Sequence, residues 1–154
     1  MIVTDFLVQL RREVKDVQNV GYTDLELIQF TNAAIQEVNL LLVKAKDPFM
    51  AADITITGGM AVPDDFLSPV GVVPVHINGG LFVIDDGSAA VSARYWKKLP
   101  YVAAMDDTMP LPDWYMPVIS RAAAIFALNR NEYQIDQDKG LMSDIAALLE
   151  SAYA

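Results

Sequence analysis

The sequence predicts a single α+β domain, mainly α, in which four helices form the core and a small antiparallel β subdomain is inserted between helices two and three. Apolar residues recur at helical spacing in the first and last thirds of the chain. The middle third alternates polar and apolar residues, and glycine pairs separate the alternating runs. We therefore expect one domain over 1–154, with two helical hairpins as the core (1–48 and 113–154) and the β insertion at 49–112.

The first third of the chain is expected to form two antiparallel helices. The apolar spacing predicts a helix over 4–17, with Thr4 as its cap and charged residues such as Arg11 on the solvent face. Thr23 and Glu26 have the spacing of a capping box, in which each side chain satisfies a free N–H of the first helical turn. They predict the start of a second, longer helix.

The middle third is expected to form short antiparallel strands. The predicted elements are a hairpin of 53–57 with 60–62, a tight turn at 63–67, a hairpin of 70–77 with 81–84, and a strand at 90–97. Gly58-Gly59 and Asn78-Gly79-Gly80 would form the hairpin turns. Pro74 should make its strand an edge strand or a broken one, because proline cannot donate to the ladder. The turn at 63–67 should tuck Phe66 under the sheet.

The last third is expected to form a second helical hairpin. A proline-containing loop over 99–112 leads to a helix from about 113 to 129, and Pro117 fits there only within the first turn. A final helix is predicted over 132–152, with Gly140 as the place where it would kink or break.

Composition excludes several classes of protein. With 154 residues and 53% hydrophobic residues, the chain is neither disordered nor long enough for two full domains. The absence of cysteine excludes a disulfide scaffold, a thiol nucleophile and thiolate metal sites. A net charge of −9 argues against a stand-alone nucleic-acid binder, because phosphate contacts need clustered Lys and Arg.

The sequence carries no targeting or membrane pattern. Its N-terminus has no basic segment and no small-residue cleavage site, so we expect no signal peptide. No apolar run approaches the ~20 residues that span a bilayer. We expect the protein to be made in a cytoplasm, to remain there unless a larger particle carries it out, and to bind no membrane.

The chain offers little that resembles catalytic chemistry. His76 is interpreted as an ordinary strand residue, because no acid or nucleophile pairs with it in a known motif. Three acid pairs (Asp64-Asp65, Asp85-Asp86 and Asp106-Asp107) are interpreted as solvated turn residues, with an adventitious cation as the alternative. We therefore expect no catalytic, cofactor-binding or metal-binding residue, and no enzymatic activity.

One local cluster combines basic and aromatic residues. Arg94, Lys97 and Lys98 flank Tyr95 and Trp96 near the end of the predicted strand. The cluster is a candidate basic patch close to a DNA backbone. It is equally a strand with alternating faces and a solvated basic end.

Large apolar side chains gather between the β insertion and the third helix. Aromatic residues and methionine are enriched at the centres of protein interfaces, and an exposed apolar loop suggests a docking surface. The alternative is that the loop packs onto its own core. The candidate subunit or portal interface residues are Trp96, Tyr101, Met105, Met109, Trp114 and Tyr115.

The chain resembles the head–tail adaptor (connector) proteins of tailed bacteriophages in four features, which follow one another along most of its length. The features are Tyr22-Thr23-Asp24-Leu25-Glu26-Leu27-Ile28 with Asn32-Ala33-Ala34, then Val62-Pro63-Asp64-Asp65-Phe66, then the tyrosine strand with Lys97-Lys98-Leu99-Pro100 leading through Asp106-Asp107 to Leu111-Pro112, and finally the Ala-rich helix from Tyr115 followed by Tyr133. Each feature alone is weak, and their order makes the resemblance more specific.

The resemblance implies a structural virion protein. Adaptors of this family form a ring, usually of twelve copies, that docks on the portal protein and extends the DNA channel toward a tail or stopper protein. They are not enzymes and use no cofactor, and DNA passes through without sequence-specific binding. The location implied is the virion neck. An acidic wall would repel DNA and let it slide.

Two other classes of function stay open. One is a different phage neck or tail-completion protein, or a general protein-interaction module. The other, which the sequence favours least, is an enzyme with a carboxylate-bound metal ion. Oligomer size, the bound partner and a metal titration distinguish the three.

Overall fold

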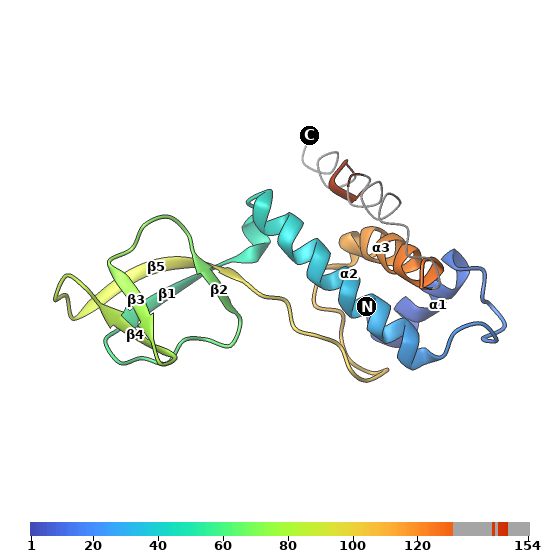
Figure 1. The fold of residues 1–154 in the computed structure, drawn as a ribbon, viewed down its shortest axis with the longest axis horizontal. Helices are drawn as coiled ribbons and strands as arrows, with labels where there is room; N and C mark the ends of the chain where they lie inside the picture. Colours follow the sequence, from blue (N-terminus) through green and yellow to red (C-terminus); the bar gives the residue numbers. More distant parts are fainter. Residues whose placement is uncertain (131–142, 144, 148–154) are drawn as a thin grey trace. The chain divides into compact units, whose positions relative to one another are not determined.

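The chain divides into two compact units, each described by itself. The computed structural model describes residues 1–130, 143 and 145–147. One unit, the helical unit, consists of Met1–Ala45 and the chain from Leu99 onward, and the other, the β unit, is Lys46–Lys98. Figure 1 labels the elements of both units.

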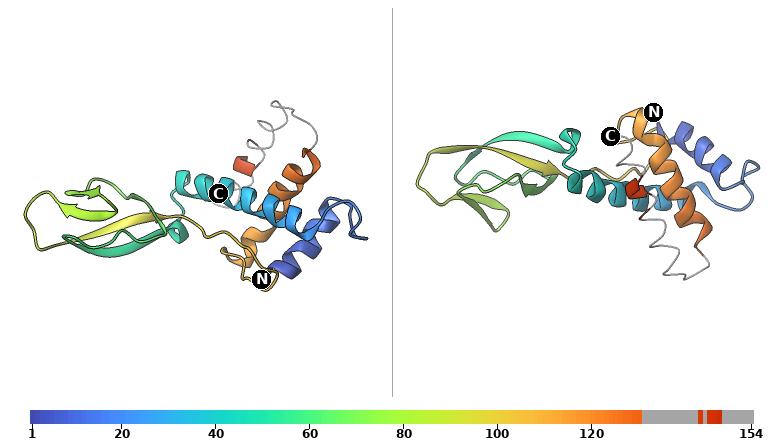
Figure 2. Two further views of the ribbon diagram at one scale, coloured as in Figure 1. Left: turned by 60° about the horizontal axis from the view of Figure 1, so that its bottom comes forward. Right: turned by 90° about the horizontal axis from the view of Figure 1, so that it is seen from above.

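The helical unit is built on three α-helices. These are α1 (Val3–Glu13), α2 (Asp24–Lys44) and α3 (Met116–Leu128), and a single 3-10 turn, η2 (Asp113–Tyr115), precedes α3. The helix α3 packs against both α1 and α2 (Figures 1 and 2). Small side chains at Ala122, Ala123 and Ala127 are fully buried, which lets the neighbouring helices approach closely.

The start of α2 confirms the predicted capping box. The Thr23 hydroxyl accepts a hydrogen bond from the Glu26 N–H at 3.2 Å, and the Glu26 carboxylate accepts one from the Thr23 N–H at 2.8 Å. These bonds with Thr23 lower the pKa of Glu26, because they favour its charged form.

The predicted bounds of the first helix were wrong at both ends. Thr4 is not its cap, because α1 begins at Val3 and the Thr4 hydroxyl instead donates to the Met105 carbonyl at 2.7 Å. The helix ends at Glu13 rather than near residue 17. Lys15 has φ 58°, which is incompatible with a continuing right-handed helix.

The third helix forms where the sequence predicts it, and the predicted fourth helix lies almost entirely outside the described residues. Pro117 lies in the first turn of α3, where its missing N–H is not needed. The predicted helix over 132–152, including Gly140, lies outside the described residues except at 143 and 145–147, which are helical.

The β unit contains two antiparallel sheets. Its strands are β1 (Ala51–Thr57), β2 (Phe66–Pro69), β3 (Val75–Asn78), β4 (Leu81–Ile84) and β5 (Ala90–Lys97), preceded by the 3-10 turn η1 (Pro48–Met50). The larger sheet has the order β1-β5-β2, and β3 and β4 form the second. In β5, Val91, Ala93 and Tyr95 are less exposed than the residues that precede each of them (Ala90, Ser92 and Arg94), as the alternation predicted.

The first predicted hairpin was wrong. The strand β1 pairs with β5 along its whole length, from Ala51 opposite Trp96 to Thr57 opposite Ala90. The chain does turn at Gly59, which has φ 79°. After the turn, however, it bonds to β4, where the Phe82 N–H donates to the Met60 carbonyl at 2.8 Å.

The second predicted hairpin is confirmed. The strands β3 and β4 pair from Val75 opposite Ile84 to Asn78 opposite Leu81. Gly79 and Gly80 join them with φ values of 60° and 78°, the positive angles that favour glycine in a tight hairpin turn.

An aromatic cluster holds the two sheets of the β unit together. The Phe66 ring meets the Phe82 ring edge-on at 5.5 Å between centroids and stacks on the Tyr95 ring at 5.2 Å. The Tyr95 hydroxyl donates to Asp65 at 2.9 Å. Burial, and then the bond to Asp65, raises the pKa of Tyr95. Phe66 makes these contacts from strand β2 itself.

The predicted fold class was wrong in its emphasis. About 41% of the described residues are helical and 22% are in strands, and five strands form two antiparallel sheets. The β region is therefore not a small attachment to a mainly helical four-helix core. It is a compact unit with its own aromatic core, so the fold is mixed.

Candidate functional site

The proline-containing loop, residues 99–112, is fixed to α2 by two asparagines. The Asn39 carboxamide oxygen accepts a hydrogen bond from the Leu99 N–H at 2.6 Å. Asn32 exchanges two bonds with the backbone of Val102, accepting from its N–H at 2.9 Å and donating to its carbonyl at 2.8 Å. Two side chains of α2 thus hold the backbone at the start of the loop in place within the helical unit.

The part of the loop after Val102 is held by the carboxylate of Asp107 and by α1. Asp107 accepts hydrogen bonds from the N–H groups of Ala103 at 2.7 Å and Ala104 at 2.9 Å. These bonds, that of Ala104 first, lower the pKa of Asp107. The N–H of Val3 donates to the Asp107 carbonyl at 2.9 Å. The loop is therefore an ordered platform.

The interface candidates in the helical unit fall into two groups. Tyr101 and Trp114 are 68% and 73% exposed. Met109 and Tyr115 are buried in the core of the unit, and Met105 is half-buried. The loop therefore presents Tyr101 to solvent and η2 presents Trp114, while Met109 and Tyr115 pack into the helical unit.

The basic candidates in the β unit are partly engaged with neighbours. Arg94 forms a two-pronged ion pair with Asp53, with Nε–Oδ1 and Nη2–Oδ2 distances of 2.7 and 3.3 Å. The hydrogen bond and charge of Arg94 lower the pKa of Asp53, and those of Asp53 raise the pKa of Arg94. The Lys97 ammonium lies 4.7 Å from the centre of the Phe49 ring. Lys98 is exposed, and Trp96 is half-buried.

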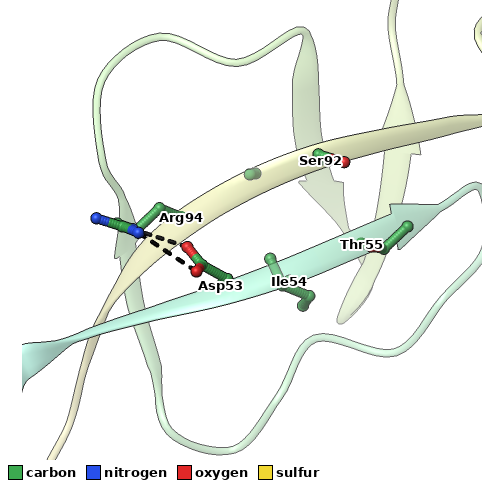
Figure 3. A pocket seen from close by; sticks show the side chains of 6 residues that line it. Asp53, Ile54, Thr55, Ser92 and Arg94 are labelled. Atoms are coloured by element: carbon green, nitrogen blue, oxygen red, sulfur yellow. Dashed lines mark hydrogen bonds and ion pairs between the residues drawn. The ribbon is translucent and has the colours of Figure 1, made fainter.

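A polar depression of about 450 Å³ lies on the β1–β5 surface (Figure 3). Its lining residues are Asp53, Ile54, Thr55, Ser92, Ala93 and Arg94. Asp53 lies opposite Arg94 in the strand register, and Thr55 lies opposite Ser92. The ion pair satisfies the charged groups, and this surface has the character of a solvated sheet face.

A second, apolar pocket of about 140 Å³ lies between the two sheets. All five strands contribute to it, together with the segment before β3. It is lined by Ile54, Ile56, Phe66, Pro69, Val73, Val75, His76, Ile77, Phe82, Ala93, Arg94 and Tyr95. The sequence analysis missed it, because the pocket depends on how β3 and β4 lie against β1 and β5.

The acid pairs mainly satisfy local hydrogen bonds. Asp86 accepts from the Ser88 N–H at 3.0 Å, which lowers its pKa. Asp85 contacts His76 Nδ1, a pairing that sequence reasoning missed because it follows from the β3–β4 hairpin. In the part of the chain that the structure describes, no group of three or more acidic, histidine or cysteine side chains could hold a metal ion.

Sequence reasoning also missed a buried ion-pair network after α1. Arg11, predicted on the solvent face, is only 7% exposed and binds Asp16 at 2.7 Å and Asp24 at 2.6 Å. Asp16, 6% exposed, also accepts the N–H groups of Val20, Gly21 and Tyr22 at 2.9, 2.9 and 3.1 Å. The network fixes the connection between α1 and α2.

Two further contacts join segments that are distant in the sequence. Asn32 on α2 binds the loop at Val102, within the helical unit. Within the β unit, the Asp65 carboxylate accepts from the Tyr95 hydroxyl, and the Asp65 backbone carbonyl accepts from the Lys98 N–H at 2.7 Å.

No family model matches this sequence, and no curated protein sequence matches it significantly. Among the described helices, none is both long enough and apolar enough to cross a membrane.

Proposed function

We propose that this protein is a structural component of a tailed-bacteriophage neck. It acts as a head–tail adaptor whose copies form a ring, dock on the portal and extend the DNA channel toward the tail. The observation that carries the proposal is the pair of exposed aromatic side chains of the helical unit, Tyr101 on the loop that Asn32 fixes and Trp114 on η2. Aromatic side chains held rigidly in the open lose little entropy when a partner covers them.

Exposed apolar side chains elsewhere support a role in assembly. Val17 and Val20 are 70% and 85% exposed on the connection that Asp16 holds in place, and Leu25 is exposed at the start of α2. A rigid apolar surface is typical of a docking site. A soluble monomer would gain stability by covering such residues.

The charge distribution supports passage of DNA rather than binding. The β unit has six acidic and four basic residues, whereas the rest of the chain has fourteen acidic and seven basic residues. In an assembled ring, an acidic channel wall would repel the phosphate backbone and let DNA slide. A lumen dominated by Lys and Arg would contradict this part of the proposal.

Electron microscopy of the protein mixed with the portal ring encoded in the same genome tests the proposal. We expect a ring of this protein on one end of the portal, with a channel continuous with that of the portal. A protein that stays monomeric with the portal present would refute the adaptor role. Binding to a tail or stopper protein in place of the portal would indicate a different neck protein.

A further inference from the structure

The core of the β unit is incompletely filled. Within Lys46–Lys98, only four apolar side chains are buried, namely Met50, Ile56, Phe82 and Tyr95. Large apolar groups on β3, β4 and the segment before them stay open to solvent, with Val72 fully exposed and Ile77 49% exposed. A unit of this size has little core to spare. The β unit therefore has apolar surface that a partner could cover.

The apolar pocket between the sheets has the size of one aromatic ring. Its volume is about 140 Å³, and its walls are mostly aliphatic and aromatic side chains of the two sheets. An apolar cavity of roughly 150 Å³ accommodates benzene. Two polar residues, His76 and Arg94, are also among the lining residues, although the Arg94 guanidinium is bound to Asp53. This combination suits a ring that carries one polar atom.

We infer that this pocket receives the Tyr101 side chain of a second copy of the chain. The inference rests on the proposed function, because it supplies the contact between neighbours in the ring. Tyr101 is 68% exposed. Asn32 holds the backbone of the next residue by hydrogen bonds to both the N–H and the carbonyl of Val102. Its phenol ring matches the pocket in size, and its hydroxyl can remain at the polar rim.

Charge complementarity favours a second copy as the occupant. The stretch around Tyr101 carries Asp106, Asp107 and Asp113 and has no Lys or Arg between residues 99 and 120, and Asp113 is already paired with the N-terminal ammonium. The strand that forms one wall of the pocket runs into Lys97 and Lys98, with no acid between residues 87 and 98, and its Arg94 is already paired with Asp53. The acidic loop of one copy would therefore be attracted to the basic strand of the next.

The contact would be heterologous, because a loop of one unit meets a pocket of the other unit. Head-to-tail contacts of this kind produce closed rings when the rotation closes. Trp114 is a poorer candidate than Tyr101 for the pocket, because its indole is larger than a benzene ring and already lies 5.7 Å from the Tyr115 ring. Trp114 remains available for a different contact.

Disulfide trapping tests the contact directly, because the chain contains no cysteine. Ala103→Cys, at an exposed position two residues after Tyr101, and Ile77→Cys are prepared as separate proteins, mixed and mildly oxidised. We expect a covalent dimer that contains one copy of each variant, since both variants keep Tyr101. Val8→Cys, on the exposed face of α1, replaces Ala103→Cys in the control mixture.

The control mixture sets the background of random collisions. Mixed dimer at the level of the Val8→Cys control would overturn the inference. An Ala103→Cys, Ile77→Cys double variant that closes a bond within one chain, with no mixed dimer from the single variants, would also overturn it, since the pocket would then hold the tyrosine of its own chain.

Filling the pocket provides a second, independent test. Ala93→Leu places a larger side chain in the pocket, whereas Ser92→Leu adds a similar side chain at the adjacent position, where it lines the polar depression on the β1–β5 surface. We expect Ala93→Leu and Tyr101→Ala to reduce self-association at least tenfold by sedimentation. Ser92→Leu and Tyr101→Phe should keep most of it. Equal behaviour of the two leucine variants would contradict the inference.

The two proposals can fail separately. If rings form on the portal but neither trapping nor Ala93→Leu has an effect, the adaptor role stands and the tyrosine contact is wrong. If the mixed dimer forms but no portal is bound, the contact stands and the adaptor role is wrong.

Discussion

At the scale of single residues, Asp16 holds together the connection between α1 and α2. Its carboxylate closes the connection from α1 to α2 by accepting three backbone N–H groups and binding Arg11. Lys15 and Asn19, with φ of 58° and 57°, adopt the left-handed backbone that this geometry requires. The strain at two non-glycine residues is offset by hydrogen bonds to a charged acceptor.

Replacing Asp16 should change how stability depends on pH. Hydrogen bonds from the backbone, that of Gly21 first, hold the pKa of Asp16 below its ordinary value. Its contribution to stability is therefore present above the unfolded pKa and is lost as pH falls through the lower folded pKa. We expect Asp16→Asn to lower the urea midpoint clearly at pH 7, and to cause a smaller loss at pH 2–3.

Glu13→Gln is the matched control for this measurement. Glu13 is exposed at the end of α1, and the variant removes one charge from the same part of the chain. It should leave the midpoint nearly unchanged at both pH values. An Asp16→Asn variant with an equal loss at pH 7 and pH 2–3 would show that charge on Asp16 is not what holds the connection.

The capping box gives a second prediction for single residues. Thr23→Ala removes the hydroxyl that accepts the Glu26 N–H, so the first turn of α2 keeps an unsatisfied donor. Loss of such a cap costs about 1 kcal/mol in the free energy of unfolding. Urea unfolding followed by circular dichroism measures the loss. Thr23→Ser keeps the hydroxyl oxygen and should retain most of the stability. If the Thr23→Ala variant were as stable as the Thr23→Ser variant, the role of the cap would be contradicted.

These two sites differ in how far the sequence predicts them. Thr23 and Glu26 form a fixed pattern three residues apart, and the local rule alone identifies the box. The partners of Asp16 are also close in sequence, but they converge only because Lys15 and Asn19 adopt positive φ angles, which are uncommon outside glycine and unexpected for lysine. A pattern of apolar spacing cannot indicate this, and it placed Arg11 on the wrong face.

At the scale of elements, the loop over 99–112 depends on α2 for its order. Asn32→Ala would remove both bonds to the Val102 backbone and leave its N–H and carbonyl without their partner. An unsatisfied group of this kind costs about 1–3 kcal/mol. We expect amide exchange at residues 102–104 to become at least fivefold faster, as measured by mass spectrometry.

Gln36→Ala serves as the comparison on the same helix. Gln36 donates to the Leu99 carbonyl over 3.4 Å, a long and weak hydrogen bond. Its removal should change exchange in the loop much less. Similar exchange rates in the two variants would mean that the prolines of the loop, and not Asn32, hold its conformation.

Strand pairing shows what sequence patterns of this kind leave undetermined. The β3–β4 hairpin was predictable, because two glycines join strands that are adjacent in the chain. The β1–β5 pair joins Asp53 to Arg94, which are 41 positions apart, and no local pattern indicates that pairing. The glycine turn after β1 was itself real, but the chain beyond it had β4 as an alternative partner.

The candidate site was predictable in composition but not in orientation. An irregular loop followed by a single 3-10 turn has no periodicity that separates inward from outward side chains, so Tyr101 and Trp114 could not be distinguished from Met109 and Tyr115. The pocket between the sheets could not be predicted at all, because it depends on the packing of strands that are distant in sequence.

At the scale of the whole molecule, the two units carry very different cores. The helical unit buries apolar side chains of α1, α2 and α3 together, including Phe6, Ile35 and Ile119, whereas the β unit relies on a few residues around Phe82. We therefore expect the β unit to be the less stable of the two. The chain has one tryptophan in each, Trp96 in the β unit and Trp114 in the helical unit, so each unit can be followed separately.

Phe82→Ala should separate the unfolding of the two units. Truncating a fully buried phenylalanine costs about 3–5 kcal/mol, which is much of what a unit this small is able to supply. In a Trp114→Phe background, Trp96 fluorescence should report a strongly lowered urea midpoint for Phe82→Ala. In a Trp96→Phe background, Trp114 should report a midpoint within error of that of the parent. Equal shifts with both reporters would mean that the two units unfold as one cooperative body. In that case the incomplete packing around the pocket would lower the stability of the whole chain rather than that of the β unit alone.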